Sequence, residues 1–198
     1  MIKRKEFFES FAADWDKNIT AEDTELIAHL SRSFKLKAGD KVADLGCGTG
    51  VLFDVLRRIV GPAGIIVGID FAFGMVRKAQ GNFPFKNCLV INADAQWLPL
   101  KSGVFDMAIS LAAFPHFPNP EQVMNEVSRI LKKNGHFYII HLLSSKELRH
   151  HHENAGGPVA MDNLPSMKKM IQLFEQNHFL KVTITDRPGL YVASGVKK

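Results

Sequence analysis

The most informative stretch of the sequence is KVADLGCGTG, residues 41–50, in which an apolar run ends in an acid and glycines follow at alternate positions. The apolar run predicts a buried strand, and helical spacing begins after Gly50, so the stretch predicts a strand, a tight turn and a helix. Gly46 and Gly48 can adopt positive φ and allow a ligand to lie against the main chain. The following helix offers unpaired backbone N–H groups at its start.

The spacing of the glycines narrows the kind of ligand. A dinucleotide-binding turn has its third glycine one residue later than Gly50, and a phosphate-binding P-loop ends in Gly-Lys-Ser/Thr. Instead, the pattern Asp44-x-Gly46-x-Gly48-x-Gly50 closely resembles the first motif of the class I S-adenosylmethionine (SAM) methyltransferases, and the chain is similar to the type 11 group of that family. The resemblance implies that the glycines face the amino-acid moiety of SAM, with Asp44 nearby.

Two further acids follow predicted strands at positions that the same family uses. Residues 65–70 and 88–92 are apolar runs, as expected for strands covered by helices on both faces. Asp70 ends the first run, about twenty residues beyond the glycine turn, where an acid can accept hydrogen bonds from both ribose hydroxyls. By resemblance, Asp70 binds the ribose of SAM, Asp94 receives the adenine amino group, and Ala95 flanks the ring.

Some of the expected cofactor contacts have a structural alternative. Trp15 lies in a break between two amphipathic helical patterns within residues 6–33, which resemble the lid that closes over cofactor and substrate in this family; Trp15 could equally be a packing anchor. Asp70 could instead cap a helix predicted for residues 71–80. The remaining expected cofactor contacts are Cys47, Phe71, Met75 and Leu111.

The order of the predicted elements indicates an α/β fold. Further strands are expected at residues 105–111 and 136–141, a hairpin at 180–185 and 190–194, and helices at 51–60, 71–80, 121–132 and 166–178. The family resemblance implies a three-layer, doubly wound and mostly parallel sheet of seven strands, with the last strand antiparallel. We expect one domain over residues 1–198, with a helical lid at 1–35 and a polar, substrate-side insertion at 144–165.

The histidines provide the clue beyond cofactor binding. His116 follows the fourth predicted strand and His141 closes the fifth, so both are expected at the carboxyl edge of the sheet, where ligands bind. A loop after His141 can add one of His150, His151 or His152, and His152 is preferred because it directly precedes a turn. Three neutral imidazoles would suit a divalent transition metal, whereas one would suffice as general base for a hydroxyl, amine or thiol. Solvated loop histidines are the third interpretation.

Composition and charge limit the other function classes. The chain has 198 residues, of which 46% are hydrophobic, and its 2 cysteines argue against a disulfide framework. The net charge is +5, but Lys and Arg are scattered, which disfavours nucleic acid as a partner. The basic start runs into acidic residues and no long apolar run follows, so we expect no signal peptide, no membrane segment and a cytoplasmic location.

These features predict a SAM-dependent methyltransferase that acts on a small-molecule acceptor. Trp15, His116, His141 and His152 form the expected substrate edge, with the three histidines as catalytic or metal-binding residues. The alternative is a non-catalytic regulatory protein that binds SAM or a metal on the same fold, because fold and cofactor do not determine turnover.

Overall fold

Seven strands form one sheet in the computed structural model, which describes residues 2–198; Met1, the first residue of the predicted lid, lies outside this range. The strand order is β3-β2-β1-β4-β5-β7-β6, and only β7 runs antiparallel to its neighbours. The predicted α/β sheet is therefore confirmed. The strands are β1 (Lys41–Leu45), β2 (Ile65–Asp70), β3 (Cys88–Asn92), β4 (Phe105–Leu111), β5 (Leu131–His141), β6 (Phe179–Arg187) and β7 (Leu190–Lys197).

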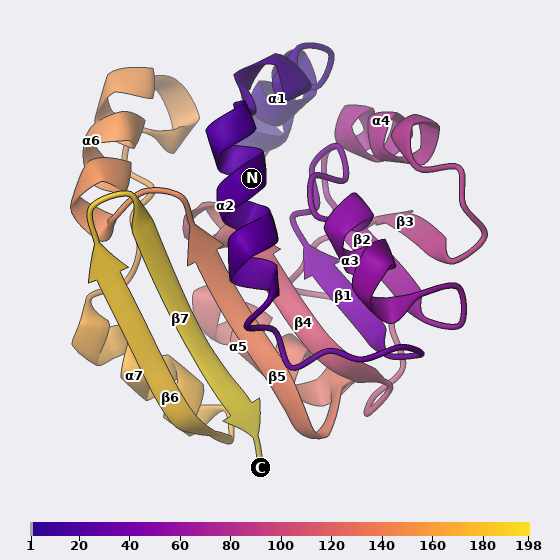
Figure 1. The fold of residues 1–198 in the computed structure, drawn as a ribbon. Coiled ribbons are helices and arrows are strands. Elements are labelled where there is room, and N and C mark those ends of the chain that lie inside the picture. The colour runs from indigo at the N-terminus through magenta and orange to yellow at the C-terminus, as the bar shows by residue number, and fades with distance from the viewer. Residues whose placement is uncertain (1) are drawn as a thin grey trace.

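Helices cover both faces of the sheet (Figure 1), with α2 and α3 in front and α5 and α7 behind in that view. The α-helices are α1 (Ile2–Phe11), α2 (Ala21–Ser31), α3 (Phe53–Val60), α4 (Phe73–Asn82), α5 (Pro120–Ile130), α6 (Ser145–Ala155) and α7 (Met167–Gln176). Short 3₁₀ turns lie at η1 (Trp15–Asn18), η2 (Phe114–His116) and η3 (Gly157–Val159). None of the helices described over residues 2–198 combines the length and apolar character needed to cross a bilayer.

The core consists of two large apolar clusters, one on each face of the sheet. Phe137 and Ile139 of β5 pack with α5 and α7 on one face, whereas Met107 and Ile109 of β4 pack with α3 on the other. A third, smaller cluster joins α1 to the start of α4 and includes Phe8. Burial of side chains on both faces explains why the parallel strands are almost continuous apolar runs.

The register of β1 and β2 brings the ends of both strands together beside the glycine turn. Leu45 pairs with Ile69, so both strands end together, and the carbonyl of Ile69 accepts hydrogen bonds from the N–H groups of Gly46 (2.8 Å) and Cys47 (3.1 Å). The glycine turn is thereby held against the end of β2. As a result, Asp70 lies directly beside the turn.

Several predicted boundaries differ from the structure. The helix predicted for residues 51–60 begins at Phe53, because the turn closes first through a hydrogen bond from Gly50 N–H to the Cys47 carbonyl (2.9 Å). The helix predicted for residues 121–132 ends at Ile130, because Leu131 already pairs with Phe105 as the first residue of β5.

The histidine-rich part of the predicted insertion is a helix and not a loop. Helix α6 begins at a capping box, in which the Ser144 side chain accepts from the Glu147 N–H and the Glu147 carboxylate accepts from the Ser144 N–H. Its three consecutive histidines therefore point in different directions around the helix axis. His152 is buried, and His150 and His151 are exposed.

Candidate active site

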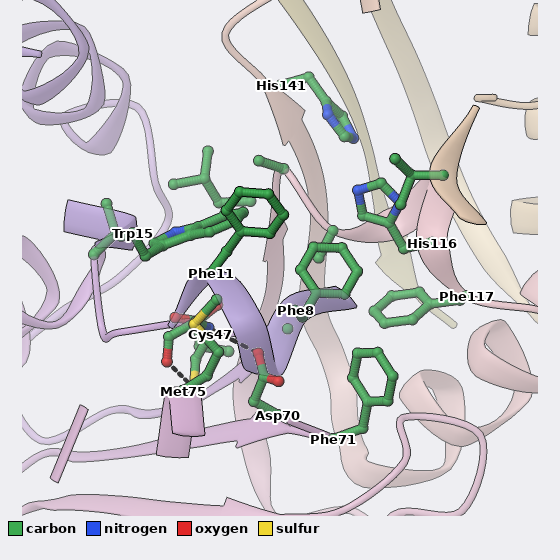
Figure 2. A pocket seen from close by; sticks show the side chains of 18 of the residues that line it. Phe8, Phe11, Trp15, Cys47, Asp70, Phe71, Met75, His116, Phe117 and His141 are labelled. Carbon is green, nitrogen blue, oxygen red and sulfur yellow. Dashed lines mark hydrogen bonds between the residues drawn. The ribbon is translucent and has the colours of Figure 1, made fainter. Parts of the chain in front are cut away.

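A cavity of about 720 Å³ lies at the carboxyl ends of β1, β2, β4 and β5. Figure 2 shows Asp70, Cys47 and Met75 at one end and His116 and His141 at the other. With the single exception of Gly50, the predicted site residues line this cavity: Trp15, Asp44, Gly46, Cys47, Gly48, Asp70, Phe71, Met75, Asp94, Ala95, Leu111, His116, His141 and His152. The volume lies in the range usual for small-molecule and cofactor sites.

The glycine turn exposes its backbone to the cavity. Gly46 and Gly48 have φ of +72° and +54°, in the left-handed region that other residues rarely adopt. Asp70 holds the turn in place, because its Oδ2 accepts a hydrogen bond from Gly48 N–H (2.9 Å) and its Oδ1 accepts one from Ala72 N–H (2.9 Å). Gly50 lies outside the cavity lining; a Cβ there would lie 2.8 Å from the Phe83 ring, so this glycine serves packing.

We expect Gly46→Ala to lower the free energy of unfolding by about 3 kcal/mol, since a Cβ is strained at this φ and overpacks its surroundings. A Cβ at Gly46 would lie 2.3 Å from the side-chain Cβ of Ala113, in the segment after β4. Urea unfolding monitored by circular dichroism measures the change in midpoint. Gly81→Ala is the matched control, because Gly81 lies in α4 with no atom within 4 Å of its Cβ position. Equal midpoints for the two variants would contradict the prediction.

Two buried carboxylates face the cavity from the ends of β1 and β2. Asp44 is 1% exposed, and neither of its oxygens has a hydrogen-bond partner among the described residues. Burial, followed by the charge of Asp70, raises the pKa of Asp44 to about 8. Burial also raises the pKa of Asp70 to about 6, although hydrogen bonds from Ala72 and Gly48 oppose the shift. A cationic group bound between these carboxylates would lower both pKa values.

The third predicted acid lies beyond β3. Asp94 Oδ1 accepts a hydrogen bond from Gln96 N–H (2.9 Å), and Oδ2 accepts one from the Gln96 side chain (2.9 Å), while the carboxylate remains part of the cavity wall. Ala95 and Met75 are 5% and 1% exposed and line the same cavity, to which they contribute apolar surface. Hydrogen-bond acceptors and apolar surface in one cavity suit a nucleoside.

The N-terminal helix covers the middle of the cavity. Phe8 contacts Trp15, Phe71 and His116, with ring-centroid distances of 5.9, 5.9 and 5.0 Å. The Glu9 carboxylate accepts hydrogen bonds from the N–H groups of Phe73 (2.9 Å) and Gly74 (2.5 Å) at the start of α4. Helix α4 has no side-chain cap of its own, so Glu9 supplies one from α1. These contacts join the predicted lid to both ends of the site.

Hydrogen bonds orient the histidines at the far end. His116 Nδ1 lies 2.8 Å from Asp162 Oδ2, and His152 Nδ1 lies 2.5 Å from the backbone carbonyl oxygen of Asp162. The rings of His116 and His152 are 4.9 Å apart between centroids. His141 is 2% exposed, and its Nε2 has no hydrogen-bond partner within the part of the chain that the structure describes. Burial, together with the neighbouring His116 and His152, lowers the pKa of His141 to about 3. His141 is therefore neutral at physiological pH.

The arrangement does not support the predicted metal site. Across residues 2–198, no group of three or more His, Cys, Asp and Glu side chains is placed to hold a metal ion. His116, His141 and His152 line one cavity, but they do not form such a group.

Four residues at or beside the site have no signal in the sequence that links them to it: Arg4, Phe8, Glu9 and Asp162. Arg4 Nε donates a hydrogen bond to Asp162 Oδ2 (3.1 Å), although the two residues are 158 positions apart in the chain. The apolar face that includes Phe8 was a signal for a packed helix and not for a ligand wall. Nothing near Asp162 in the sequence connects it to His116 or Arg4.

The chain is similar in sequence to known methyltransferases. Residues 36–183 match the family model described as a methyltransferase domain. The chain is similar to demethylmenaquinone methyltransferase of Lactobacillus johnsonii, with 35% identity over 52% of this chain and 44% of that protein. It is also 32% identical to malonyl-[acyl-carrier protein] O-methyltransferase of Geobacter sulfurreducens, over 69% of this chain and 53% of the relative. The chain thus spans about half the length of these curated relatives.

The fold has close counterparts among solved structures. A chain in the complex of the Haloferax volcanii Trm112 methyltransferase activator with its methyltransferase partner superposes with a TM-score of 0.80, at 22% identity over 96% of both chains. At 22% sequence identity, this similarity shows a shared fold. The family match covers residues 36–183, a range that includes the glycine turn and the acids at the strand ends. The chain belongs to the class I SAM-dependent methyltransferase family.

Proposed function

We propose that the chain transfers the methyl group of SAM to a small-molecule acceptor bound at the histidine end of the cavity. The observation that carries this proposal is the continuity of the cavity, since the glycine turn, the strand-end carboxylates and the imidazoles line one space. Membership of the methyltransferase family supports SAM as the cofactor. SAM supplies an electrophilic methyl group on a sulfonium, so the protein must chiefly align a nucleophile and accept a proton.

The residues at the turn suit the parts of SAM. Asp44, with two buried and unpartnered oxygens, is placed to accept hydrogen bonds from the cofactor's ammonium group beside Gly46 and Gly48. Asp70 is placed to accept hydrogen bonds from the ribose hydroxyls, and Asp94 from the adenine amino group. Apolar contacts to the cofactor come from Cys47, Phe71, Met75, Ala95 and Leu111. Trp15 lies over the turn, with its Nε1 3.6 Å from the Cβ position of Gly48.

The position of the N-terminal helix over the cavity supports a small acceptor. Helix α1 places Phe8 against both Phe71 and His116, so an acceptor reaches the histidines through a space walled by aromatic rings. Two relatives are named for demethylmenaquinone and for a malonyl group on acyl-carrier protein. Because the chain spans only about half of those proteins, their names support methyl transfer as the type of reaction and do not identify the acceptor of this chain.

The proposal is tested by calorimetric titration with SAM and with its demethylated product, followed by transfer of a tritiated methyl group to 2-naphthol, phenethylamine and thiophenol. We expect binding of both nucleosides and labelled product from at least one acceptor. Absence of nucleoside binding would overturn the proposal. Binding without transfer to any of the three would instead favour the non-catalytic SAM-binding protein.

A chelator tests whether methyl transfer depends on a metal ion. We expect EDTA to leave the methyl-transfer rate unchanged, because among the described residues His116, His141 and His152 do not form a group that could hold a metal ion. The measurement compares the initial rate before dialysis, after dialysis against EDTA, and after addition of Zn²⁺, Ni²⁺ or Fe²⁺. A rate that is lost on chelation and restored by one of these ions would show that a metal acts in the reaction.

A further inference from the structure

Three side chains from distant parts of the chain form a continuous hydrogen-bonded row behind the histidine end of the cavity. Arg4 of α1 bonds to both oxygens of Asp162, and Asp162 Oδ2 also bonds to His116 Nδ1 (2.8 Å). The Asp162 side chain is only 3% exposed, the His116 side chain 13% and the Arg4 side chain 27%. A buried carboxylate that accepts charge-assisted hydrogen bonds from two side chains holds both of them in place.

The row determines which nitrogen of His116 carries the proton. Burial raises the pKa of Asp162, but hydrogen bonds and charges from His116 and Arg4 outweigh burial and hold this pKa below its usual range. The carboxylate is therefore ionised and can only accept, so His116 Nδ1 donates to it. This leaves the lone pair of neutral His116 on Nε2. Figure 2 shows the His116 imidazole projecting into the cavity near His141.

The other groups that face His116 bring no negative charge. His152 of α6 and His141 of β5 are the neighbouring titratable groups, and burial is the main cause that lowers the pKa of each. Phe8 of α1 lies edge-on to the His116 ring at a centroid distance of 5.0 Å. Arg4 already compensates the charge of Asp162. A cationic acceptor such as an ammonium ion would have no free anionic partner here, whereas a neutral hydroxyl compound would fit.

We propose that Asp162, supported by Arg4, is a positioning residue that holds His116 as the general base for a neutral, largely apolar acceptor with an acidic hydroxyl of the phenol or enol type. This inference rests on the proposed function and names the substrate class of the same site. Hydroxyls of this kind have a pKa of about 10, which an imidazole can assist at neutral pH, unlike the hydroxyl of a simple alcohol.

The proton and the electrons balance with no further reactant. The acceptor hydroxyl gives its proton to His116 Nε2, and its oxygen, or the conjugated carbon, forms a bond to the methyl carbon. The bond between the methyl carbon and the sulfonium sulfur breaks, and the electron pair of that bond stays on sulfur. Asp162 stabilises the imidazolium until the proton leaves to solvent.

The positioning role is tested first without an acceptor. Nitrogen-15 NMR of the full chain at pH 8 distinguishes the two neutral tautomers of His116, whose signals are identified by their loss in His116→Asn. We expect the Nδ1–H tautomer in the unmodified chain and a mixture with the Nε2–H tautomer in Asp162→Ala. Asp54→Ala is the matched control, because it removes a carboxylate–guanidinium pair on the exposed surface of α3. An unchanged tautomer in Asp162→Ala would overturn the role of Asp162.

The second test measures methyl transfer to 2-naphthol. We expect Asp162→Ala to lower kcat by about 100-fold with KM changed by less than about threefold, and Asp162→Glu to restore part of the rate. In the His116→Asn background, removal of Asp162 should cost nothing further, because it acts through His116. An additive loss in the double variant would indicate a structural role and overturn the proposal.

Calorimetry with the demethylated product of SAM separates this inference from the proposed function. We expect Asp162→Ala to bind this nucleoside as the unmodified chain does, which also shows that the variant folds. Transfer to phenethylamine but not to 2-naphthol would overturn the acceptor class. Failure of the unmodified chain to bind the nucleoside would overturn the proposed function, whereas the tautomer result still decides the role of Asp162.

Discussion

Asp70→Ala is expected to weaken SAM binding by at least about 100-fold. A hydrogen bond to a charged group contributes about 1.5–3 kcal/mol, and two ribose hydroxyls can donate to this carboxylate. The same side chain also holds the glycine turn through Gly48 N–H, so its loss loosens the backbone on which the cofactor lies. Calorimetric titration with SAM measures the change, and Asp54→Ala provides a surface control. An unchanged affinity would show that Asp70 serves only the turn.

The pH dependence of this binding follows from the raised pKa of Asp70. Burial raises that pKa to about 6, so the carboxylate is ionised at pH 7 and above and becomes protonated as the pH falls through 6. A protonated carboxyl loses acceptor capacity for the ribose hydroxyls. Protonation of Asp70 should therefore make SAM affinity fall up to about tenfold more for each pH unit below 6, beyond the decrease that protonation of Asp44 causes. In Asp70→Asn this additional decrease below pH 6 should be absent, whereas an equally steep decrease in that variant would assign it to another group.

Three strands could be predicted to the residue because short apolar runs between turn residues are a local signal, whereas the strand predicted at 136–141 begins at Leu131. The strand at residues 65–70 was predicted to the residue, as were those at 88–92 and 105–111, since each is an apolar run between turn residues. Helix ends were less predictable because tertiary pairing competes with helical spacing. Leu131, for example, extends β5 beside Phe105 in place of continuing α5.

The sequence also predicted that the strand-end acids lie at one edge of the sheet, whereas it predicted the surroundings of the histidines only in part. Asp44 and Asp70 stand at the ends of recognisable strands, so the sequence places them at one edge. His116 and His141 follow from the same rule. By contrast, Arg4 and Asp162 meet only because α1 folds over the sheet edge near the segment after α6, a long-range contact that no local pattern records.

The start of α4 shows the same limit. A helix usually has a capping side chain at its own N-terminus, but here Ala72 occupies that position and makes no side-chain hydrogen bond. The carboxylate of Glu9 supplies the bonds from α1 instead. A sequence read one segment at a time therefore detects a missing cap, but it cannot find the residue that replaces it.

Asp44→Asn is expected to change stability and SAM affinity in opposite directions. The pKa of Asp44 is raised to about 8 by burial and by the charge of Asp70, whereas an aspartate in the unfolded chain keeps its ordinary pKa of 3.8. Between these values the unfolded chain has lost a proton that the folded chain retains, so the free energy of unfolding falls as the pH rises. Asparagine does not ionise and removes this dependence. Relative to the unmodified chain, the Tm of Asp44→Asn should therefore rise by about 10 °C between pH 4 and pH 8.

The affinity for SAM should fall at the same time, because an amide replaces the anion that faces the cofactor's ammonium group. Differential scanning fluorimetry with and without SAM measures both effects: the cofactor should raise the Tm of the unmodified chain but barely that of the variant. Binding should also expel the proton from Asp44, since a nearby cation lowers its pKa. Calorimetry at pH 7 in buffers of different ionisation enthalpy should therefore record proton release on binding, and none in Asp44→Asn. Equal proton release by both chains would place the ammonium group away from Asp44.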